Sequence, residues 1–395
     1  MRSFEFYAPT KVVFGPGSEE RAGELVKEFG GTKALVHFGG QSAKRSGLLD
    51  RVVASLDAQG IGHVLFGGVE PNPRLSLVRE GIKLVADEGI DFILAVGGGS
   101  VIDSAKAIAY GAADPARGDV WDFYLGQREA TAAMPIGVVP TVAATGSEMS
   151  GSSVITENKT GTKRGYENNL SRPRFALMNP ELTLTVSPYQ TASGCVDILM
   201  HTMERYFNAA QPMYTTDRMA EALMRSVIYN ARELKANPGD LQARAEVMWA
   251  AALSHNDVTG PRALGDWSCH QLEHELSGMF DVAHGAGLAA IWGSWARFVM
   301  DANPARFERF AMKVMDLEYH PEQGRDLAIQ GIEAMEAFFR ELGMPTSIPD
   351  LGINPSDKQL ECMARGASRN GTRTLGTFRV LTEQDMLAIY RHAMG

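Results

Sequence analysis

The stretch that decides the fold of the first half of the chain is Phe92-Ile-Leu-Ala-Val96, which runs through Gly97-Gly98-Gly99-Ser100 into Val101-Ile-Asp-Ser-Ala-Lys-Ala-Ile-Ala109. A short, continuous apolar run is typical of a parallel strand buried on both faces. The glycines let the backbone come close to a ligand, and the free N–H groups at the start of a helix favour an anion. The pattern predicts a strand, a turn that binds pyrophosphate, and a helix. A tight turn without a ligand is the alternative.

Similar units surround this stretch. Strands are predicted at residues 4–14, 33–38, 63–69, 92–96 and 136–140, and helices from Ser18-Glu19-Glu20 to Gly30 and at about 43–59, 74–88 and 101–110. From Ser187-Pro188, an N-cap followed by proline, the pattern is helical, at about 188–207, 215–235, 240–256, 261–278, 286–301, 304–315, 325–341, 355–367 and 382–393. The sequence predicts a doubly wound, Rossmann-like α/β domain over residues 1–186 and an all-α domain over residues 187–395.

A second polar loop follows the strand at 136–140. It contains Thr141, Thr145, Ser147 and Glu148, whose side chains can hydrogen-bond a polar ligand. Open parallel sheets bind ligands at the carboxyl ends of their strands, where this loop and the glycine-rich turn both lie. The two loops together predict a nucleotide site. The alternative for the second loop is a cluster that caps a helix N-terminus.

The helical half contains the candidate metal ligands. Asp197 and His201 are four residues apart, so on a helix both side chains leave the same face. Three of the nine histidines, His270, His274 and His284, fall within fifteen residues and can complete a shell of imidazoles and one carboxylate. Such a set suits Zn²⁺ or Fe²⁺ better than Mg²⁺ or Ca²⁺. The alternative is that Asp197 and His201 form an ordinary helix-surface pair and the other histidines are unrelated core or surface residues. A cleft between the domains would bring metal and nucleotide face to face.

Length and composition limit the possible classes of protein. A chain of 395 residues with 45% hydrophobic and 22% charged residues is typical of a globular protein of about two domains. The net charge of −9 argues against a general binder of nucleic acid or of membrane surfaces, which are polyanionic. No signal peptide or membrane span is predicted, and the cytoplasm is the expected compartment. Cys195, Cys269 and Cys362 are too few for a disulfide framework, and the first two are interpreted as core thiols.

Four motifs together resemble the iron-containing (group III) alcohol dehydrogenase family. They are Gly97-Gly98-Gly99-Ser100-Val-Ile-Asp103, the loop from Pro140-Thr141 to Glu148, Asp197-x3-His201, and His270-x3-His274-x9-His284-Gly285. The likeness extends over essentially the whole chain and is greatest to the branch of NADPH-dependent butanol dehydrogenases and aldehyde reductases. The resemblance implies a dehydroquinate synthase-like architecture, an NAD(P)H cofactor, one Fe²⁺ or Zn²⁺ ion, a small aldehyde or alcohol substrate, and a homodimer.

The resemblance also implies roles for particular residues. Asp197, His201, His270 and His284 would hold the metal, while His274 would face substrate and nicotinamide as a catalytic group. The nucleotide would be contacted by Gly98, Gly99, Ser100, Asp103, Thr141, Thr145, Ser147 and Lys163, with Asn72 on the adenosine side and Leu182 at the nicotinamide. For His274, a proton-transfer role and a role in orienting a metal ligand are both open.

The expected chemistry is hydride transfer between nicotinamide and an oxygen-bearing carbon, with the oxygen held by a cation. Glycerol dehydrogenases and dehydroquinate synthases share the architecture, so polyol oxidation or a cyclisation is one alternative. A metal-dependent hydrolase would share the Asp/His shell but would not need the glycine loops. A non-catalytic nucleotide-binding protein would bind cofactor without turnover.

The segment after the second strand predicts a preference for NADPH over NADH. Folds that select NAD commonly carry an acidic residue there, which repels a 2′-phosphate. Here the strand 33–38 leads instead to Gly39-Gly40-Gln41-Ser42-Ala43-Lys44-Arg45, where Gly39, Gly40 and Ser42 are the expected contacts and two cations follow. The alternative is that Lys44 and Arg45 are ordinary solvated charges.

Overall fold

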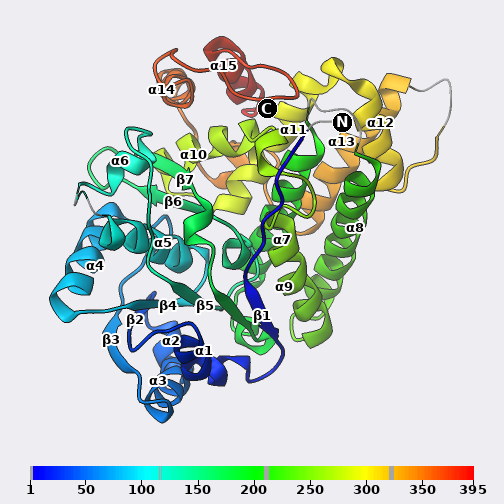
Figure 1. Cartoon of the computed structure of the whole chain (residues 1–395). Coiled ribbons are helices and arrows are strands. Elements are labelled where there is room, and N and C mark those ends of the chain that lie inside the picture. Colours follow the sequence, from blue (N-terminus) through cyan, green and yellow to red (C-terminus); the bar gives the residue numbers. More distant parts are fainter. Residues whose placement is uncertain (1–2, 115, 117, 209–212, 320–323) are drawn as a thin grey trace. The chain divides into compact units, whose positions relative to one another are not determined.

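The computed structural model describes residues 3–114, 116, 118–208, 213–319 and 324–395 (Figure 1). The chain divides into two compact units. Tyr7–Val186 forms an α/β unit, and Ser187–Gly395 forms a helical unit together with residues 3–6. Each unit is described separately below.

The α/β unit is built on a six-stranded sheet in the order β1-β8-β5-β4-β2-β3. Its strands are β1 (Lys11–Phe14), β2 (Lys33–Phe38), β3 (Gly62–Phe66), β4 (Phe92–Gly97), β5 (Ile136–Pro140) and β8 (Phe175–Met178). Every neighbouring pair is parallel, with Val36 opposite Leu94 and Leu94 opposite Gly137. The predicted doubly wound class is confirmed.

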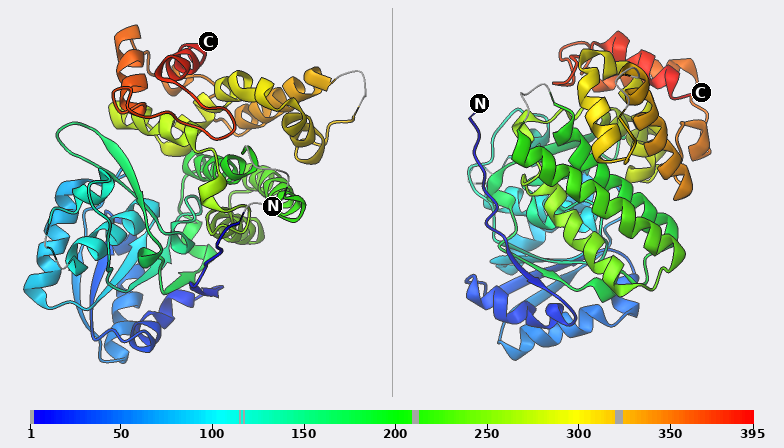
Figure 2. Two further views of the ribbon diagram at one scale, coloured as in Figure 1. Left: turned by 45° about the horizontal axis from the view of Figure 1, so that its top comes forward. Right: turned by 90° about the vertical axis from the view of Figure 1, so that its right-hand side faces the viewer.

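Helices cover both faces of this sheet (Figure 2). On one face, α1 (Ala22–Glu28) and α3 (Leu48–Ala58) share a core with alternate residues of the central strands, including Val36 and Leu94. On the other face, α5 (Gly99–Ala113) packs on β4 and β5, and α4 (Leu75–Glu88) packs on α5. The period of two along each strand therefore sends apolar side chains to both helical layers.

Several local predictions for this unit were wrong. Residues 4–14 form only the four-residue β1, and β8 and the antiparallel hairpin β6 (Ser152–Thr156) with β7 (Lys163–Glu167) were not predicted. The helix expected at 43–59 is split into α2 (Ser42–Arg45) and α3, because Gly47 between them is left-handed with φ 70°. Ser18 does not cap a helix and begins the 3₁₀ turn Ser18–Arg21. A further short helix, α6 (Trp121–Tyr124), precedes β5.

The helical unit contains the predicted series of helices. They are α7 (Pro188–Tyr206), α8 (Tyr214–Ala236), α9 (Leu241–His255), α10 (Ser268–Phe280), α11 (His284–Val299), α12 (Pro304–Lys313), α13 (Gly324–Glu341), α14 (Asp357–Ala367) and α15 (Glu383–His392). One prediction was wrong, since the helix expected at 261–278 begins only at Ser268. Trp267 precedes it with φ 61°, a backbone conformation that interrupts a right-handed helix.

Helix α11 lies against both α7 and α10. A Cβ atom on Gly285, in the first turn of α11, would stand 2.0 Å from the backbone oxygen of Ser193 in α7. Only glycine permits this approach, so Gly285 sets the spacing of the helices that carry the candidate metal ligands. Cys195 and Cys269 are free, buried thiols, as predicted. Among the described residues, no helix is both long and apolar enough to cross a membrane.

Candidate functional site

Helix α7 presents the first two candidate metal ligands. Its start is fixed by Ser187, whose hydroxyl accepts from the backbone N–H of Gln190, and by Pro188 at the first helical position. One turn separates Asp197 from His201, and the Nδ1 atom of His201 lies 3.6 Å from Oδ1 of Asp197. Both side chains are buried.

Two more imidazoles converge on the same carboxylate oxygen. The Nε2 atom of His270, in α10, lies 3.9 Å from Oδ1 of Asp197. The Nε2 atom of His284, the first residue of α11, lies 3.7 Å from it. Three helices thus bring one ring nitrogen each of His201, His270 and His284 within 3.9 Å of Oδ1 of Asp197.

This donor set fits a divalent cation. Ligand atoms about 2.1 Å from a tetrahedral ion lie about 3.4 Å from one another, close to the separations found here. The buried Nδ1 of His201 and Nε2 of His270 have no hydrogen-bond partner among the described residues. Burial, reinforced by neighbouring imidazoles, holds the pKa of His201 well below its usual value and lowers the pKa of His270 to about 3. Both rings therefore keep a lone pair for a cation at neutral pH.

The cluster is more open on one side. The side chain of His284 is 26% exposed, whereas those of Asp197, His201 and His270 are 4–6% exposed. Solvent and small molecules can therefore reach the cluster from the side of His284, as a catalytic metal site requires and a closed structural site does not.

His274 lies beside this cluster. It is buried on α10, one turn after His270, and its ring centroid is 5.7 Å from that of His284. His274, Glu273 and His284 bring ligand atoms within 4.8 Å of one another, whereas the group with Asp197 contains His201 and His270. The location is compatible with both roles considered for His274.

The sequence interpretation missed three residues at this site. Glu204 accepts hydrogen bonds from His270, Glu273 contacts Nδ1 of His284, and the ring of His255 lies 4.1 Å from that of His201. A signal was present for two of them. Glu204 follows His201 by three residues, and Glu273 follows His270 by three, so each lies on the ligand-bearing face of its helix.

In the α/β unit, the glycine-rich turn and the second polar loop pack against each other. Gly98 is the N-cap of α5, and Gly99 is its first residue. A Cβ atom on Gly99 would stand 2.4 Å from Cγ2 of Thr145, and the backbone N–H of Thr141 donates to the oxygen of Gly97. Ser100 follows in the first turn of α5. Glycine is therefore needed at position 99 for the loops to approach each other.

Several predicted nucleotide contacts bond to one another. The Oδ1 atom of Asp103 accepts from the hydroxyl of Ser147 at 2.7 Å, and Oδ2 accepts from the backbone N–H of Val154 at 3.0 Å. Thr145 accepts from the backbone N–H of Ser147. Lys163, buried at the start of β7, contributes an electrostatic interaction that lowers the pKa of Asp103, although burial dominates and raises it. Asp103 and Ser147 thus shape the loop.

Lys106, which the sequence interpretation did not select, stabilises this loop through hydrogen bonds to its backbone. Its fully buried ammonium donates to the backbone oxygens of Ser147, Ser150 and Ser152 at 2.7–2.8 Å. Burial lowers its pKa to about 7.

The remaining predicted contacts lie at other loops of the α/β unit. Gly39 and Gly40 directly follow β2, and Ser42 is the exposed first residue of α2. Asn72 is left-handed with φ 54°. Leu182, in the 3₁₀ turn Pro180–Thr183, packs against the core that contains α1 and α3.

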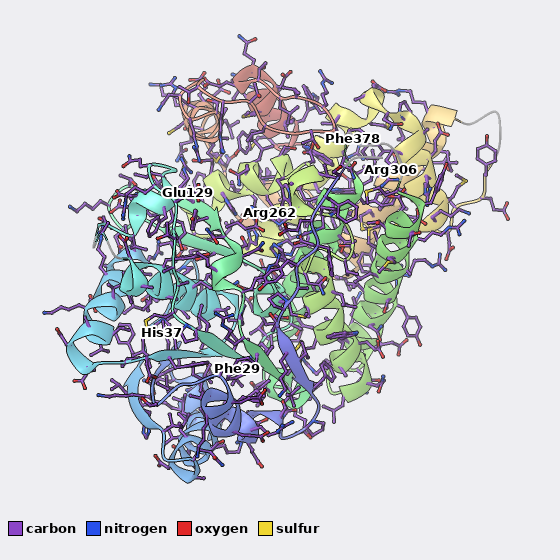
Figure 3. The ribbon with its side chains drawn as sticks, in the orientation of Figure 1. Phe29, His37, Glu129, Arg262, Arg306 and Phe378 are labelled. Carbon is purple, nitrogen blue, oxygen red and sulfur yellow. The ribbon has the colours of Figure 1, made fainter. Side chains whose placement is uncertain are left out.

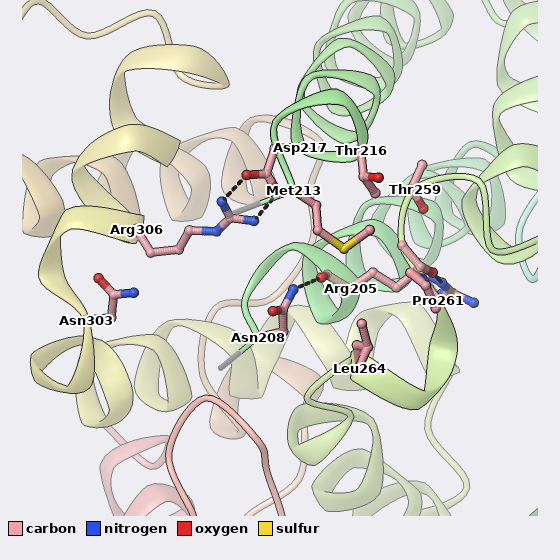
Figure 4. Close-up of a pocket in the computed structure, with 11 residues that line it drawn as sticks. Arg205, Asn208, Met213, Thr216, Asp217, Thr259, Pro261, Leu264, Asn303 and Arg306 are labelled. Atoms are coloured by element: carbon pink, nitrogen blue, oxygen red, sulfur yellow. Dashed lines mark hydrogen bonds and ion pairs between the residues drawn. The ribbon is translucent and has the colours of Figure 1, made fainter. Parts of the chain in front are cut away.

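A small cavity in the helical unit does not resemble a substrate site. Its volume is about 40 Å³, and it is lined by residues that include Arg205, Asp217, Thr259 and Arg306 (Figure 4). Arg306 forms two hydrogen bonds with Asp217, and Arg205 pairs with Asp257. Its volume suits a few water molecules.

Comparisons with known proteins agree with this geometry. Residues 9–180 match "Iron-containing alcohol dehydrogenase", and residues 191–394 match "Fe-containing alcohol dehydrogenase family, C-terminal". The chain belongs to the iron-containing alcohol dehydrogenase family. It is 39% identical to a probable NADH-dependent butanol dehydrogenase 1 of Bacillus subtilis and 33% identical to the NADPH-dependent aldehyde reductase YqhD of Escherichia coli, in each case over 100% of both chains.

Solved structures support the same assignment. The NADH-dependent butanol dehydrogenase A of Thermotoga maritima superimposes with a TM-score of 0.94 at 37% identity, covering 100% of this chain and 99% of that one. This iron-containing alcohol dehydrogenase family member is therefore a metal-dependent oxidoreductase of alcohols and aldehydes that uses a divalent metal and NAD(P)H. The predicted family, fold class and enzyme class are confirmed.

Proposed function

We propose that the protein transfers a hydride between NAD(P)H and a small aldehyde or primary alcohol, with the helical unit holding the metal and the α/β unit holding the dinucleotide. The observation that carries this proposal is the convergence of His201, His270 and His284 on Asp197, with two buried ring nitrogens that have no described partner. Such a shell supplies, when loaded, a Lewis acid for the carbonyl or alcohol oxygen.

The residues of the chain have distinct parts in this proposal. Asp197 and the three neutral imidazoles bind the ion and leave it with a net positive charge. His284, at the exposed side of the cluster, faces the route by which substrate arrives. His274 lies next to His284 and moves or holds a proton during turnover. The Gly98–Gly99 turn binds the pyrophosphate through backbone N–H groups at the start of the fifteen-residue α5.

For the cofactor, we propose a preference for NADPH. Gly39-Gly40 replaces the acidic residue that would repel a 2′-phosphate, and the exposed cations Lys44 and Arg45 follow. The relatives differ on this point, since butanol dehydrogenases at 35–39% identity are named NADH-dependent and the aldehyde reductase at 33% is named NADPH-dependent. A homodimer and a cytoplasmic location belong to the same proposal. The three free cysteines fit a reducing compartment.

Replacement of ligands tests the proposed site. His201→Ala and His284→Ala should lower bound metal and reduce aldehyde-dependent oxidation of NADPH by more than about 100-fold, beyond what loss of an outer contact causes. Metal content measured after purification without added metal, an aldehyde panel with both cofactors, and nucleotide binding by fluorescence are the readouts. Nucleotide should still bind both variants. Wild-type metal content in either variant would refute the ligand assignment.

A further inference from the structure

We propose that Glu204 and Glu273 are positioning residues that fix the tautomer and orientation of the metal-binding imidazoles of His270 and His284. The inference rests on the ligand set proposed above. Each glutamate belongs to one helix and contacts a histidine of another, so the two contacts link α7 to α10 and α10 to α11.

Glu204 makes two contacts with the same residue. Its Oε1 atom accepts from the backbone N–H of His270 at 2.8 Å and lies 2.9 Å from Nδ1 of that ring. Because Oε1 already accepts from the backbone N–H, we take it as the acceptor toward the ring too, so that Nδ1 carries the hydrogen and the lone pair lies on Nε2. Nε2 is the atom that faces Asp197. The contact therefore selects the tautomer that a cation at Asp197 requires.

Glu273 acts in the same way on His284. Its Oε2 atom contacts Nδ1 of His284, which leaves Nε2 to face Asp197. Glu273 is fully buried, and a Cβ atom on Gly287, one turn after His284, would stand 2.9 Å from its Oε1. Glycine at position 287 thus keeps open the space that Glu273 occupies. Within the segment 284–287, Gly285 permits the close approach of α11 to α7. Gly287 leaves room for Glu273, which contacts His284.

The charges around the site favour this interpretation. Asp197, Glu204 and Glu273 place three buried carboxyl groups around the imidazoles of the proposed site. Buried carboxylates are costly unless a cation or strong donors compensate them. A divalent ion at Asp197 would supply that compensation, while hydrogen bonding to a carboxylate raises the basicity of each ligating ring.

A second glutamate against α11 provides a matched control. Glu336 of α13 lies over Gly293 as Glu273 lies over Gly287, and a Cβ atom on Gly293 would meet Oε1 of Glu336 at 1.7 Å. Glu336 bonds Arg297 through both oxygens at 2.6 Å. It is therefore a helix-packing carboxylate with its own cation, in the same kind of setting as Glu273.

The experiment measures affinity for Co²⁺ in the full-length protein. Metal would be removed with a chelator, and Co²⁺ titrated into wild type, Glu204→Gln, Glu204→Ala, Glu273→Gln, Gly287→Ala and the control Glu336→Gln, with the visible absorption band as readout. Loss of an outer-shell partner should weaken metal binding about 10- to 100-fold, with a smaller loss in Glu204→Gln, which keeps an acceptor oxygen. Glu336→Gln should keep the wild-type dissociation constant.

A spectroscopic signature separates orientation from general stability. In the Zn²⁺-loaded protein, the Nδ1–H proton of His270 should give a slowly exchanging NMR signal that disappears in Glu204→Ala and remains in Glu336→Gln. Wild-type Co²⁺ affinity in Glu204→Ala and Glu273→Gln, together with loss of metal in His270→Ala, would overturn the positioning roles and leave the ligand set intact. Metal retention in His270→Ala itself would instead overturn the ligand set. If Glu204→Ala fails to fold, Glu204→Gln and Gly287→Ala decide the question.

Discussion

The proposed metal centre of the helical unit and the proposed nucleotide loops of the α/β unit differ in what they offer a ligand. Around Asp197, side chains converge, and ring nitrogens of His201 and His270 have no partner among the described residues. In the loops, the side chains of Asp103 and Ser147 bond to each other. What these loops offer is backbone, at Gly98 and Gly99. The proposed metal site is made of converging side chains, and the proposed nucleotide site is a backbone surface shaped by its own side chains.

This difference between side-chain and backbone donors determines how well each kind of site can be predicted from a sequence. Metal ligands reveal themselves by residue type and helical spacing, because the side chains do the binding. A backbone site reveals itself only by glycines, and polar residues beside them can serve the loop as well as the ligand. Histidines in the two units differ in the same way: the buried ring nitrogens Nδ1 of His201 and Nε2 of His270 have no hydrogen-bond partner among the described residues, whereas both ring nitrogens of His37 have one. His37, in the sheet (Figure 3), contacts the backbone oxygen of Phe66 and the hydroxyl of Ser104 through its two ring nitrogens.

Among the variants that leave the proposed metal ligands intact, the largest effect is expected at His274, which lies beside those ligands without joining the group around Asp197. His274→Ala should retain most of the metal and lower kcat about 100-fold, the lower range for a group that transfers a proton. Steady-state rates from pH 6 to 9 and metal analysis are the measurements, with the pH range set by the histidine pKa of about 6.5. An unchanged rate across that range would reduce His274 to a packing role.

The next test addresses the backbone site. Gly99→Ala should weaken NADPH binding about 10- to 100-fold, because a Cβ atom 2.4 Å from Thr145 forces the two loops apart at a cost of about 1–3 kcal/mol. Metal content should not change. Gly165→Ala, in the hairpin, is the control, since its nearest neighbour would be an ordinary 3.7 Å away. Equal nucleotide affinity in Gly99→Ala and wild type would show that the turn is not a phosphate site.

A third test contrasts His37 with the metal-centre histidines. Burial lowers its pKa to about 4, below the value of about 6.5 expected in the unfolded chain. The unfolded state therefore binds the proton first, and the stability that neutral His37 contributes is complete above pH 6.5 and lost as pH falls toward 4. Up to about 3 kcal/mol is involved. Urea unfolding at pH 7 and pH 5 should show a smaller loss of stability in His37→Gln than in wild type, with metal content unchanged. Identical pH dependence in both proteins would contradict this role.

Local patterns predicted the architecture better than they predicted its irregular parts. Strands β2 and β5 have the bounds that the sequence predicted, and α7 begins at Ser187-Pro188 as its capping signal indicates. The hairpin β6–β7 escaped prediction because its polar strands lack the apolar run used to find the others. The break before α10 depends on Trp267, whose backbone is left-handed and whose ring centre lies 4.7 Å from the guanidinium carbons of both Arg205 and Arg262. Such tertiary contacts are not visible in a local window.

At the candidate site too, local spacing predicted some residues, whereas those that depend on tertiary contacts were missed. The spacing of Asp197, His201, His270 and His284 was sufficient to select residues that the structure brings together. The contacts of Glu204 and Glu273 could not be assigned to their histidines, because each joins two helices separated in the sequence. Lys106 was missed because a lysine in a helix is expected to be exposed to solvent. Here its side chain is buried and donates hydrogen bonds to three backbone oxygens.

The smallest expected effect concerns cofactor choice. Gly39 directly follows β2, and a Cβ atom there would meet the backbone oxygen of Val69 at 3.4 Å, an ordinary contact, so a larger residue fits without moving the chain. Lys44 and Arg45 lie exposed beyond it, with the Lys44 ammonium 5.2 Å from the ring centre of Phe38. A carboxylate at position 39 would repel a 2′-phosphate and accept a hydrogen bond from a free ribose hydroxyl.

Gly39→Asp should therefore move the ratio of kcat/KM for NADPH to that for NADH toward NADH by about tenfold, as expected for one charge pair near the protein surface. Gly39→Asn is the matched control, because it has the same size without the charge and should shift the ratio much less. Both cofactors would be compared with one aldehyde at fixed ionic strength, since screening weakens exposed charges. A wild type that favours NADH, or an Asp variant whose ratio equals that of the Asn variant, would show that the segment after β2 does not read the 2′-phosphate. In that case the cofactor would be selected by a contact outside the segment after β2.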